Sequence, residues 1–583
     1  MIKELIRSVR EYKIYAILTP ILVAGEAAMD VLIPYIMSML IDNGIEKRDL
    51  AYTWRIGLLL ALVCIAALAF GMFSAMTAAK ASTGFAANLR HDMYYNVQNY
   101  SFSNIDKFSP ASIVTRLTTD VNNVQNSFQM VIRTAVRSPL MLIFAVIMSF
   151  GINVKLSLIF VLVIPILAGG LLFIIKKAHP IFEKVFKLYD KLNNVVAENL
   201  HGIRVVKSFV REDHENKKFK DVSGDIYRNF SKAEKILALN SPLMQFCMYL
   251  CILLISWFAA HFIVKSGNGA LDENGMTTGL LMTLISYASQ ILMSLMMLSF
   301  VFVMITISRA SMERIVEVLD EKSDIANPEN AVKEIKDGSI VFENVDFSYA
   351  KDKNKLCLSG VNLYIRSGET VGVIGGTGAS KTTLVHLIPR LYDATSGSVR
   401  IGGRDVREYD IKSLRDEVAV VLQKNVLFSG TIKENLRWGK ADATDAEIRH
   451  ACALACADEF VETFPEGYDT YIEQGGANVS GGQKQRLCIA RALLKKPKIL
   501  ILDDSTSAVD TATDAKIRKA FREEIPNTTK IIIAQRISSV QDADKIIVLD
   551  DGMVNDVGSH EELLARNEIY REVYTSQQKG VMS

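Results

Sequence analysis

The chain has 583 residues, which is too long for one ordinary domain, and half of these residues are hydrophobic. The formal net charge of +2 excludes the strongly basic balance expected of a nucleic-acid-binding protein. The seven cysteines lack metal-site spacing, so we expect free thiols. Apolar segments are concentrated in the first half, whereas the sequence from about Asn327 onward is typical of a soluble α/β domain. We therefore expect a multi-domain protein with a membrane-embedded part and no nucleic-acid partner.

The first thirteen residues are charged and precede a long apolar stretch. This arrangement resembles a signal peptide, but the apolar stretch continues well past the length of a signal-peptide core. We expect residues 1–13 to form an amphipathic elbow helix on the cytosolic membrane surface, followed by a retained membrane span.

Six segments approach the ~20 apolar residues of helix that a hydrocarbon core requires. They lie at residues 14–41, 56–78, 136–150, 156–175, 243–264 and 278–306. An even number of spans places both chain ends on one side of the membrane. Cations crowd the start of the chain and the two long connections, at Lys3, Arg7, Arg10, Lys13, Lys80, Arg90, Arg133, Arg137, Lys176 and Lys177. The positive-inside rule therefore predicts a multi-pass protein of the cell (plasma) membrane with cytosolic termini and connections.

The connections at 79–135 and 176–240 contain few glycines or prolines and show helical periodicity. We therefore predict an all-α six-span domain at residues 14–326, whose membrane helices continue far into the cytosol. Each connection has one break suited to a short transverse helix, near 109–124 in the first and near 198–212 in the second.

Two acidic residues of the first span, Glu26 and Asp30, are four apart and share one helix face. Charged groups at membrane depth are costly and require a reason. One hypothesis is a polar, proton-sensitive cavity. The other, which we favour, is a buried hydrogen-bonded pair that fixes helix packing. Tyr287, Ser289 and Gln290 of the sixth span are candidates for lining a pathway.

A linker at 327–337 leads into a predicted α/β domain at residues 338–583. An apolar strand at 370–374 runs into GGTGASKTT, which comes close to the phosphate-binding pattern G-x-x-x-x-G-K-[ST] between a strand and a helix. Backbone N–H groups of such a loop bind phosphates, Lys381 would reach the β- and γ-phosphates, and Thr382 would hold Mg²⁺. ATP and Mg²⁺ are therefore the expected cofactors. The candidate ATP-binding residues of this loop are Gly375, Gly376, Thr377, Gly378, Ala379, Ser380, Lys381, Thr382 and Thr383.

Two further motifs follow. The apolar segment 499–502 ends in Asp503, at the spacing expected of a Mg²⁺-supporting Walker B aspartate, and VSGGQ occupies residues 479–483. With these three motifs the sequence resembles the ABC superfamily, of which VSGGQ is the signature. The resemblance covers essentially the whole chain and is to half-transporters of the multidrug-exporter type, in which a membrane domain is fused to a P-loop nucleotide-binding domain.

The resemblance implies a role for each matching residue. Tyr349 matches the aromatic residue that stacks on adenine, and Gln423 matches the glutamine that contacts Mg²⁺ and senses the membrane domain. Asp510 matches the loop that crosses the dimer interface. The two transverse helices match coupling helices. The signature residues, which bind the γ-phosphate of ATP held by the opposite subunit, match Ser480, Gly481, Gly482 and Gln483.

Three residues depart from the family pattern within one site. Asp504 stands where active members carry the catalytic glutamate that polarises water, and its side chain is one methylene shorter. Gln535 replaces the switch histidine and cannot carry a positive charge, and Ser380 replaces the last glycine of the phosphate loop. Because a positional error near 1 Å costs on the order of 100-fold in rate, we predict an ABC-type ATPase site that binds ATP but hydrolyses it poorly.

The intact signature favours a chain that completes a competent site on a second, non-identical half-transporter, as in asymmetric heterodimeric bacterial ABC exporters. Neutral drift within a homodimeric exporter is the alternative. We expect ATP-driven export of a small hydrophobic or amphipathic substrate, drug-like or lipid, by a protein surrounded by membrane lipid. An ATP-gated channel or regulatory subunit would require an ion pathway that the sequence does not indicate. The six spans exclude a soluble ATPase engaged with nucleic acid.

Overall fold

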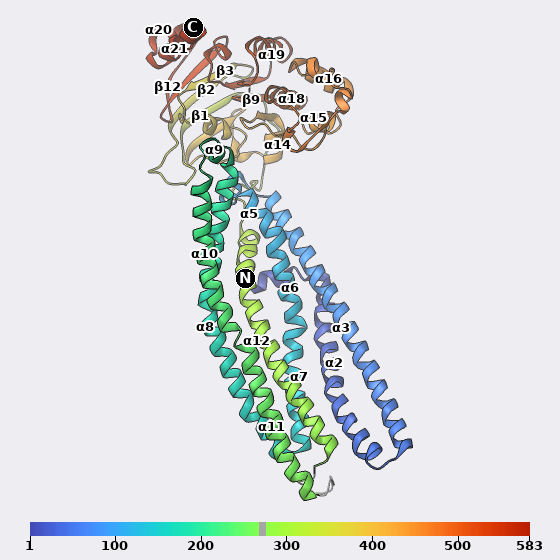
Figure 1. Cartoon of the computed structure of the whole chain (residues 1–583). Coiled ribbons are helices and arrows are strands. Elements are labelled where there is room, and N and C mark those ends of the chain that lie inside the picture. The colour runs from blue at the N-terminus through green and yellow to red at the C-terminus, as the bar shows by residue number, and fades with distance from the viewer. Residues whose placement is uncertain (267–275, 506, 583) are drawn as a thin grey trace. The chain divides into compact units, whose positions relative to one another are not determined.

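The computed structural model describes residues 1–266, 276–505 and 507–582 and divides into two compact units (Figure 1). The first unit consists of Met1–Gln98 and Ser109–Glu321, and the second of Asn99–Phe108 and Lys322–Ser583. In the described ranges the first unit is helical, whereas the strands all belong to the second. The fold class predicted from the sequence is therefore confirmed.

The helices of the first unit alternate between long rods and short connecting pieces. In chain order they are α1 (Ile2–Arg7), η1 (Arg10–Tyr12), α2 (Lys13–Met39), η2 (Leu40–Ile45), α3 (Leu50–Gln98), α5 (Pro110–Thr115), η3 (Arg116–Asp120), α6 (Val121–Ile132), α7 (Thr134–Ile152), α8 (Val154–His201), α9 (Ile203–Ser208), α10 (Glu212–Leu237), α11 (Asn240–Ser266) and α12 (Thr278–Asp320).

Among the described residues, six helical stretches are long and apolar enough to cross a membrane, and they contain all six segments predicted from the sequence. The helices α3 and α8 have 49 and 48 residues. At 1.5 Å per residue each is about 70 Å long, more than twice the ~30 Å hydrocarbon core. The predicted helical extensions beyond the membrane spans are therefore present.

The N-terminal segment is held against α3 by polar contacts. Ser8 Oγ donates to Asp92 Oδ2 at 2.7 Å, and Arg10 Nη2 donates to Asp92 Oδ1 at 2.5 Å. Gly84 of α3 allows the chain to approach closely, since a Cβ at this position would lie 2.4 Å from the Tyr12 ring. Residues 1–13 thus form two short helical turns, α1 and η1, rather than one continuous helix.

The two predicted breaks differ in the structure. In the second, α8 ends at His201 with Gly202 as its C-cap, and the short helix α9 follows within the range 198–212. In the first, the range 109–124 contains α5, η3 and the start of α6. A further short helix, α4 (Phe102–Lys107), precedes that range and belongs to the second unit. Its start signal is a capping box between Ser101 and Asn104, which the sequence analysis missed.

The second unit contains three sheets within the described ranges, with strand orders β2-β1-β4-β5, β12-β11-β3-β10-β9-β6 and β7-β8. In the six-stranded sheet, the strands from β11 to β6 are parallel and β12 is an antiparallel edge. The strands are β1 (Ile340–Phe347), β2 (Leu358–Ile365), β3 (Thr370–Gly375), β4 (Ser396–Ile401), β5 (Arg404–Asp405), β6 (Val418–Val421), β7 (Gly430–Thr431), β8 (Tyr471–Ile472), β9 (Ile499–Asp503), β10 (Thr529–Ile533), β11 (Lys545–Asp550) and β12 (Met553–Gly558).

Helices surround these sheets and connect the strands. They are α13 (Lys381–His386), η4 (Val406–Glu408), α14 (Ile411–Glu417), α15 (Ile432–Arg437), α16 (Asp445–Leu454), α17 (Asp458–Val461), η5 (Gly467–Asp469), η6 (Gln474–Gly476), α18 (Gly481–Leu494), α19 (Thr511–Glu524), η7 (Ile537–Ser539), α20 (His560–Arg566) and α21 (Glu568–Met582).

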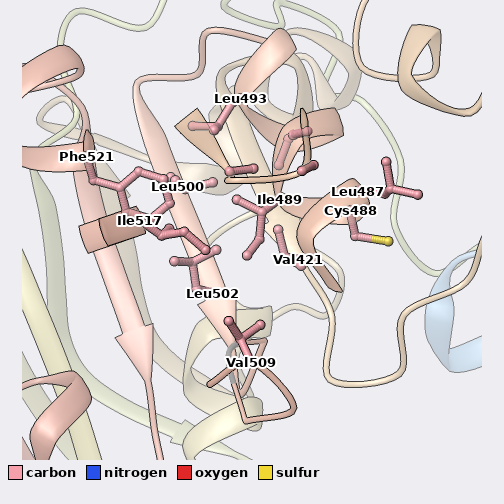
Figure 2. Close-up of a cluster of buried hydrophobic side chains, with 14 of the residues drawn as sticks. Val421, Leu487, Cys488, Ile489, Leu493, Leu500, Leu502, Val509, Ile517 and Phe521 are labelled. Atoms are coloured by element: carbon pink, nitrogen blue, oxygen red, sulfur yellow. The ribbon is translucent and has the colours of Figure 1, made fainter. Parts of the chain in front are cut away.

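The central strands β9 and β10 are buried along their whole length, as expected of parallel strands covered on both faces. Figure 2 shows Leu500 and Leu502 of β9 packed in one apolar cluster with Ile489 of α18 and Ile517 of α19. Because β3, β9 and β10 are parallel neighbours, the loops that follow them leave the sheet at one edge. This edge carries the candidate site.

Candidate functional site

The phosphate-loop candidates Gly375–Ser380 connect the end of β3 to α13, in the strand–loop–helix context that the motif requires. The ammonium group of Lys381 donates to the carbonyl oxygens of Gly375 at 2.9 Å and Gly376 at 2.8 Å. Burial lowers the pKa of Lys381, and the nearby carboxylates of Asp503 and Asp504 oppose this shift. The loop and both acids therefore form one site.

Ser380, where the family pattern has glycine, adopts the left-handed conformation with φ 64° and ψ 28°. A residue with a Cβ costs roughly 1–2 kcal/mol in this conformation, which glycine adopts freely. The serine keeps the backbone course that the loop needs, at the cost of local strain.

Asp503 ends β9 and is almost fully buried. Thr382 Oγ1 donates to Asp503 Oδ1 at 3.1 Å, whereas Oδ2 has no hydrogen-bond partner among the residues that the structure describes. Burial raises the pKa of Asp503, and the Thr382 hydroxyl opposes this shift. A buried carboxylate oxygen beside a hydroxyl is a donor set that suits a hard cation such as Mg²⁺. These two residues fit the expected metal, and a bound Mg²⁺ would neutralise phosphate charge there.

Asp504, Gln535 and Gln423 converge although they follow three different strands. Gln535 Nε2 donates to Asp504 Oδ2 at 2.8 Å. Burial raises the pKa of Asp504, and hydrogen bonds from Gln423 and Gln535 oppose this shift. Two of the three departures from the family pattern are thus in direct contact.

Tyr349 lies close to the end of the phosphate loop. Its hydroxyl group is 3.1 Å from Thr383 Oγ1, within hydrogen-bond distance, and its side chain is 48% exposed. An exposed ring at this place can stack on a nucleotide base, which is the role that the resemblance implies.

The signature residues begin α18. Ser480 is its N-cap, and it forms a capping box with Gln483, in which Ser480 N donates to Gln483 Oε1 at 2.9 Å. Ser480 and Gly481 are exposed. The exposed start of a fourteen-residue helix offers free N–H groups to an anion. The side chain of Gln483 takes part in the cap rather than projecting freely.

The loop at 507–510 is joined to the signature helix. Ala508 N donates to Gln485 Oε1 at 3.1 Å, and Asp510 caps α19 by accepting from Thr513 N at 2.9 Å. Sequence reasoning missed Gln485, which fixes the loop that carries Asp510 onto α18.

Gln577 is a second residue that the sequence did not single out. Its Nε2 donates to the carbonyl oxygen of Gln535 at 2.8 Å, and its Oε1 accepts from Ile537 N at 2.9 Å. The C-terminal helix α21 thereby holds the backbone on which Gln535 stands. Only the tertiary contact reveals this role, because Gln577 lies in an unremarkable polar stretch.

In the first unit, Glu26 and Asp30 of α2 meet Arg137 of α7. Arg137 Nη2 lies 2.7 Å from Asp30 Oδ2 and 3.4 Å from Glu26 Oε1, and Ser74 Oγ donates to Glu26 Oε2 at 3.1 Å. Arg137, which charge placement in the sequence assigns to a loop, is a half-exposed residue of α7 that forms an ion pair with the acids of α2. This contact supports the packing hypothesis for the two acids.

The sixth-span candidates also contact α2. The buried Tyr287 hydroxyl group donates to the carbonyl oxygen of Val31 at 2.8 Å, and Gln290 Nε2 donates to that of Asp30 at 3.3 Å. Ser289 Oγ bonds back to Ile285 O within α12. Tyr287 and Gln290 therefore join helices α12 and α2, whereas Ser289 does not. The seven cysteines, in both units, are free as predicted.

Known proteins share this architecture over nearly the whole chain. Residues 16–315 match the ABC transporter transmembrane region, and residues 358–507 match the ABC transporter family. The uncharacterized ABC transporter ATP-binding protein YfiB of Bacillus subtilis is 36% identical over 97% of both chains. The ATP-dependent lipid A-core flippase of Desulfotalea psychrophila is 31% identical over 99% of both chains.

A solved structure agrees with the sequence matches. A bacterial Atm1-family ABC exporter with ATP bound is similar with a TM-score of 0.81 and 25% identity, covering 98% of each chain. The chain therefore belongs to the ABC transporter family, as an exporter half-transporter in which a six-helix membrane domain is fused to an ATP-binding domain.

Proposed function

We propose that this chain is the subunit with the degenerate ATP site in a heterodimeric ABC exporter of the cell membrane. Its own Walker site binds ATP with Mg²⁺ and hydrolyses it slowly. Its signature completes a competent site on a second, non-identical half-transporter. The nucleotide-binding domain and both termini are cytosolic.

The contact between Asp504 and Gln535 carries this proposal. A general base must lie within hydrogen-bond reach of the water that it activates. Asp504 is one methylene shorter than the glutamate of active members, and Gln535 donates to Oδ2 of its carboxylate at 2.8 Å. The neutral amide supplies a hydrogen bond but no positive charge for a developing phosphate. Both features slow hydrolysis without preventing ATP from binding.

The signature supports the second half of the proposal. Gly481 is exposed at the capped start of α18, so its backbone N–H group is accessible to an anion on another chain. Four of the matched relatives, YfiB, YknU, YknV and YfiC, come from one organism, Bacillus subtilis. A cell can therefore contain several such chains, and a non-identical pairing is available to a member of the family.

The proposed substrate is a hydrophobic or amphipathic small molecule, either a drug-like compound or a lipid. One relative is named a lipid A-core flippase, which favours an amphipathic lipid as one member of this class. The helices of the membrane domain are apolar with few charged groups, in keeping with a substrate that reaches the site from the bilayer.

A measurement of ATPase activity tests whether the chain works together with a non-identical half-transporter. The chain is purified alone and after co-expression with candidate half-transporters, in nanodiscs, with Asp504→Glu as a third sample. We expect near-silence for the chain alone and strong activity with a partner that carries the catalytic glutamate. Brisk turnover by the chain alone, abolished by Asp504→Asn, would establish a homodimeric pump instead.

A further inference from the structure

A polar pocket of about 320 Å³ lies where α6, α7 and α12 meet. It is lined by Asn126, Gln129, Met130, Arg133, Thr134 and Met304. Arg133 stands between α6 and α7, and its φ of −114° and ψ of −67° depart from regular helix geometry. The apolar segment of the third span begins three residues later, at 136, so the pocket lies at one edge of the membrane-spanning part. The proposed topology makes this the cytosolic edge.

Hydrogen bonds between helices hold the walls of this pocket. Asn123 Nδ2 of α6 donates to Ser311 Oγ of α12 at 3.2 Å, and Ser308 Oγ of α12 donates to Asn123 O at 3.3 Å. Ser82 Oγ of α3 donates to Gln129 Oε1 at 3.3 Å. These contacts hold α6 against both α12 and α3, so the packing of the helices themselves forms the pocket.

Arg133 gives the pocket an uncompensated positive charge. Its half-buried side chain has no hydrogen-bond or ion-pair partner among the residues that the structure describes, and none of the six lining residues is acidic. Arg137, about one helical turn further along, differs because Glu26 and Asp30 neutralise it. A charge that is partly removed from water is stabilised by a counter-ion. The pocket therefore favours an anionic ligand.

The other lining residues supply hydrogen-bond donors and apolar surface. Within the described ranges the Asn126 side chain has no partner and Gln129 uses only its amide oxygen, so both NH₂ groups can donate. A phosphate offers three strong acceptor oxygens, enough for the guanidinium group and both amides. Met130 and Met304 add adaptable apolar surface beside these donors. The set matches a phosphate that is attached to an apolar chain.

We propose that this pocket binds the head group of the exported amphipath, and that this head group is a phosphate monoester on an apolar chain. Arg133 is the counter-ion, Asn126 and Gln129 donate to the phosphate oxygens, and Met130 and Met304 contact the start of the chain. The inference rests on the proposed export of an amphipathic substrate and narrows that substrate to an anionic one. A cationic amphipath would meet the like charge of Arg133.

Ligand binding to the full-length protein tests this in nanodiscs of zwitterionic phosphatidylcholine, without nucleotide. Octyl phosphate, octyl glucoside, octyltrimethylammonium and inorganic phosphate are titrated calorimetrically below their micelle concentrations, and empty nanodiscs are subtracted. We expect octyl phosphate to bind at least about tenfold more tightly than each other probe. The glucoside and the ammonium compound lack charge-assisted bonds to Arg133. Inorganic phosphate buries no methylene groups, each of which contributes about fourfold in affinity.

Arg133→Met removes the charge and keeps an unbranched side chain. We expect the Kd for octyl phosphate to rise by about 10- to 100-fold, as for loss of hydrogen bonds to a charged group, and the Kd for octyl glucoside to change little. Arg133→Lys keeps the charge and should recover part of the affinity. Lys176→Met is the matched control, because Lys176 is an exposed cation at the predicted cytosolic end of the fourth span and does not line the pocket. It should leave all four Kd values unchanged.

Four outcomes would overturn the inference. Equal affinity for octyl phosphate in the parent and in Arg133→Met would exclude Arg133 as its counter-ion. Octyltrimethylammonium that binds as tightly as octyl phosphate would refute an anion site. Inorganic phosphate that binds as tightly would leave a site for free phosphate and refute the amphipathic ligand. A rise in Kd by the same factor for every probe in Arg133→Met, together with a lower melting temperature, would make Arg133 merely structural.

These titrations require neither ATP hydrolysis nor a partner subunit. Their failure would therefore leave the heterodimer proposal intact, since the ATPase experiment decides that proposal separately. A homodimeric pump, in turn, could still bind octyl phosphate through Arg133.

Discussion

Gln535 Nε2 donates a 2.8 Å hydrogen bond to Oδ2 of Asp504, so two of the residues at which this ATP site departs from the family pattern bind each other. The amide thus engages one oxygen of the Asp504 carboxylate. A histidine in this place could be protonated and stabilise negative charge on phosphate, which a glutamine cannot do. The two departures therefore act together and should be tested together.

Restoring both residues should raise hydrolysis more than either change alone. In Asp504→Glu the carboxylate extends by one methylene, and we expect ATP turnover at this site to increase by about 10- to 100-fold, since that is the rate effect of a ~1 Å displacement. Adding Gln535→His should increase it further and non-additively, because the residues are in contact. Steady-state phosphate release with the partner's own site inactivated measures both. Equal rates in parent and double variant would refute a degenerate site.

Two glycines of the signature offer a matched pair of substitutions. A Cβ on Gly481 would meet Ala508 Cβ at 3.8 Å, an ordinary contact, whereas a Cβ on Gly482 would lie 2.8 Å from the carbonyl oxygen of Ala508. Gly481→Ala should therefore leave stability and this chain's own ATP affinity unchanged. It should reduce ATPase activity of the complex with a partner by about 100-fold, because the added methyl group would hold the partner's phosphate ~1 Å farther from the backbone N–H group. Gly482→Ala should also displace the loop at 507–510. Full partner-dependent activity in Gly481→Ala would contradict a role in trans.

Replacing Tyr349 should weaken nucleotide binding strongly only where the substitution removes the aromatic ring. Stacking of a base on an aromatic side chain contributes about 1–3 kcal/mol, so Tyr349→Ala should raise the Kd for ATP by roughly 5- to 150-fold. Tyr349→Phe keeps the ring and loses only the contact with Thr383 at 3.1 Å, so its Kd should stay within about threefold, as for one partly buried hydrogen bond. Competition with a fluorescent ATP analogue gives both values. A Phe variant as weak as the Ala variant would show that the hydroxyl contact, and not stacking, binds the nucleotide.

Metal removal should weaken ATP binding through Asp503 and Thr382. Asp503 Oδ2 lacks a hydrogen-bond partner within the described ranges and lies beside the Thr382 hydroxyl, which bonds Oδ1 at 3.1 Å. We expect EDTA to raise the Kd for ATP by about tenfold or more, since the cation shields phosphate from carboxylate charge. In Asp503→Asn this Mg²⁺ dependence should largely disappear, whereas the exposed surface change Glu523→Gln should preserve it. An unchanged Mg²⁺ effect in Asp503→Asn would exclude this aspartate as a metal ligand.

The ion cluster that Arg137 forms with Glu26 and Asp30 in the membrane domain should stabilise the folded protein. Arg137 is the cation that faces both Glu26 and Asp30, and Glu26 is 8% exposed. Arg137→Met leaves buried negative charge without its counter-ion, and we expect the free energy of unfolding to fall by about 1–3 kcal/mol. Adding Glu26→Gln should restore part of this loss. The exposed pair Arg309–Glu313 provides a control, since Arg309→Met should cost ~0.5 kcal/mol or less. Thermal unfolding in nanodiscs measures all three, and equal melting temperatures for Arg137→Met and Arg309→Met would refute the structural role.

Sequence reasoning predicted the six spans, the helical extensions and the α/β domain because each depends on local pattern. The buried strand ILILD and the run TVGVIG before the phosphate loop carry their own hydrophobic periodicity, and the structure has them as β9 and β3. Helix α4 was missed because it has six residues and no apolar period, and only its capping box marks it. Arg137 was misassigned for a similar reason, because positive charge in sequence does not reveal its partners on another helix.

The sequence by itself determined the family of this protein and the order of its two parts, and it predicted the residues of an ATP site, because motifs and apolar periods are properties of contiguous segments. Only the tertiary structure decided that Gln535 bonds Asp504, that Gln577 of α21 supports the backbone of Gln535, and that Arg137 bridges Glu26 and Asp30. These contacts join residues from 31 to more than 100 positions apart. The geometry of these contacts depends on strand order and helix packing. Many weak interactions between residues far apart in the sequence together set that order and packing, and no local pattern encodes them.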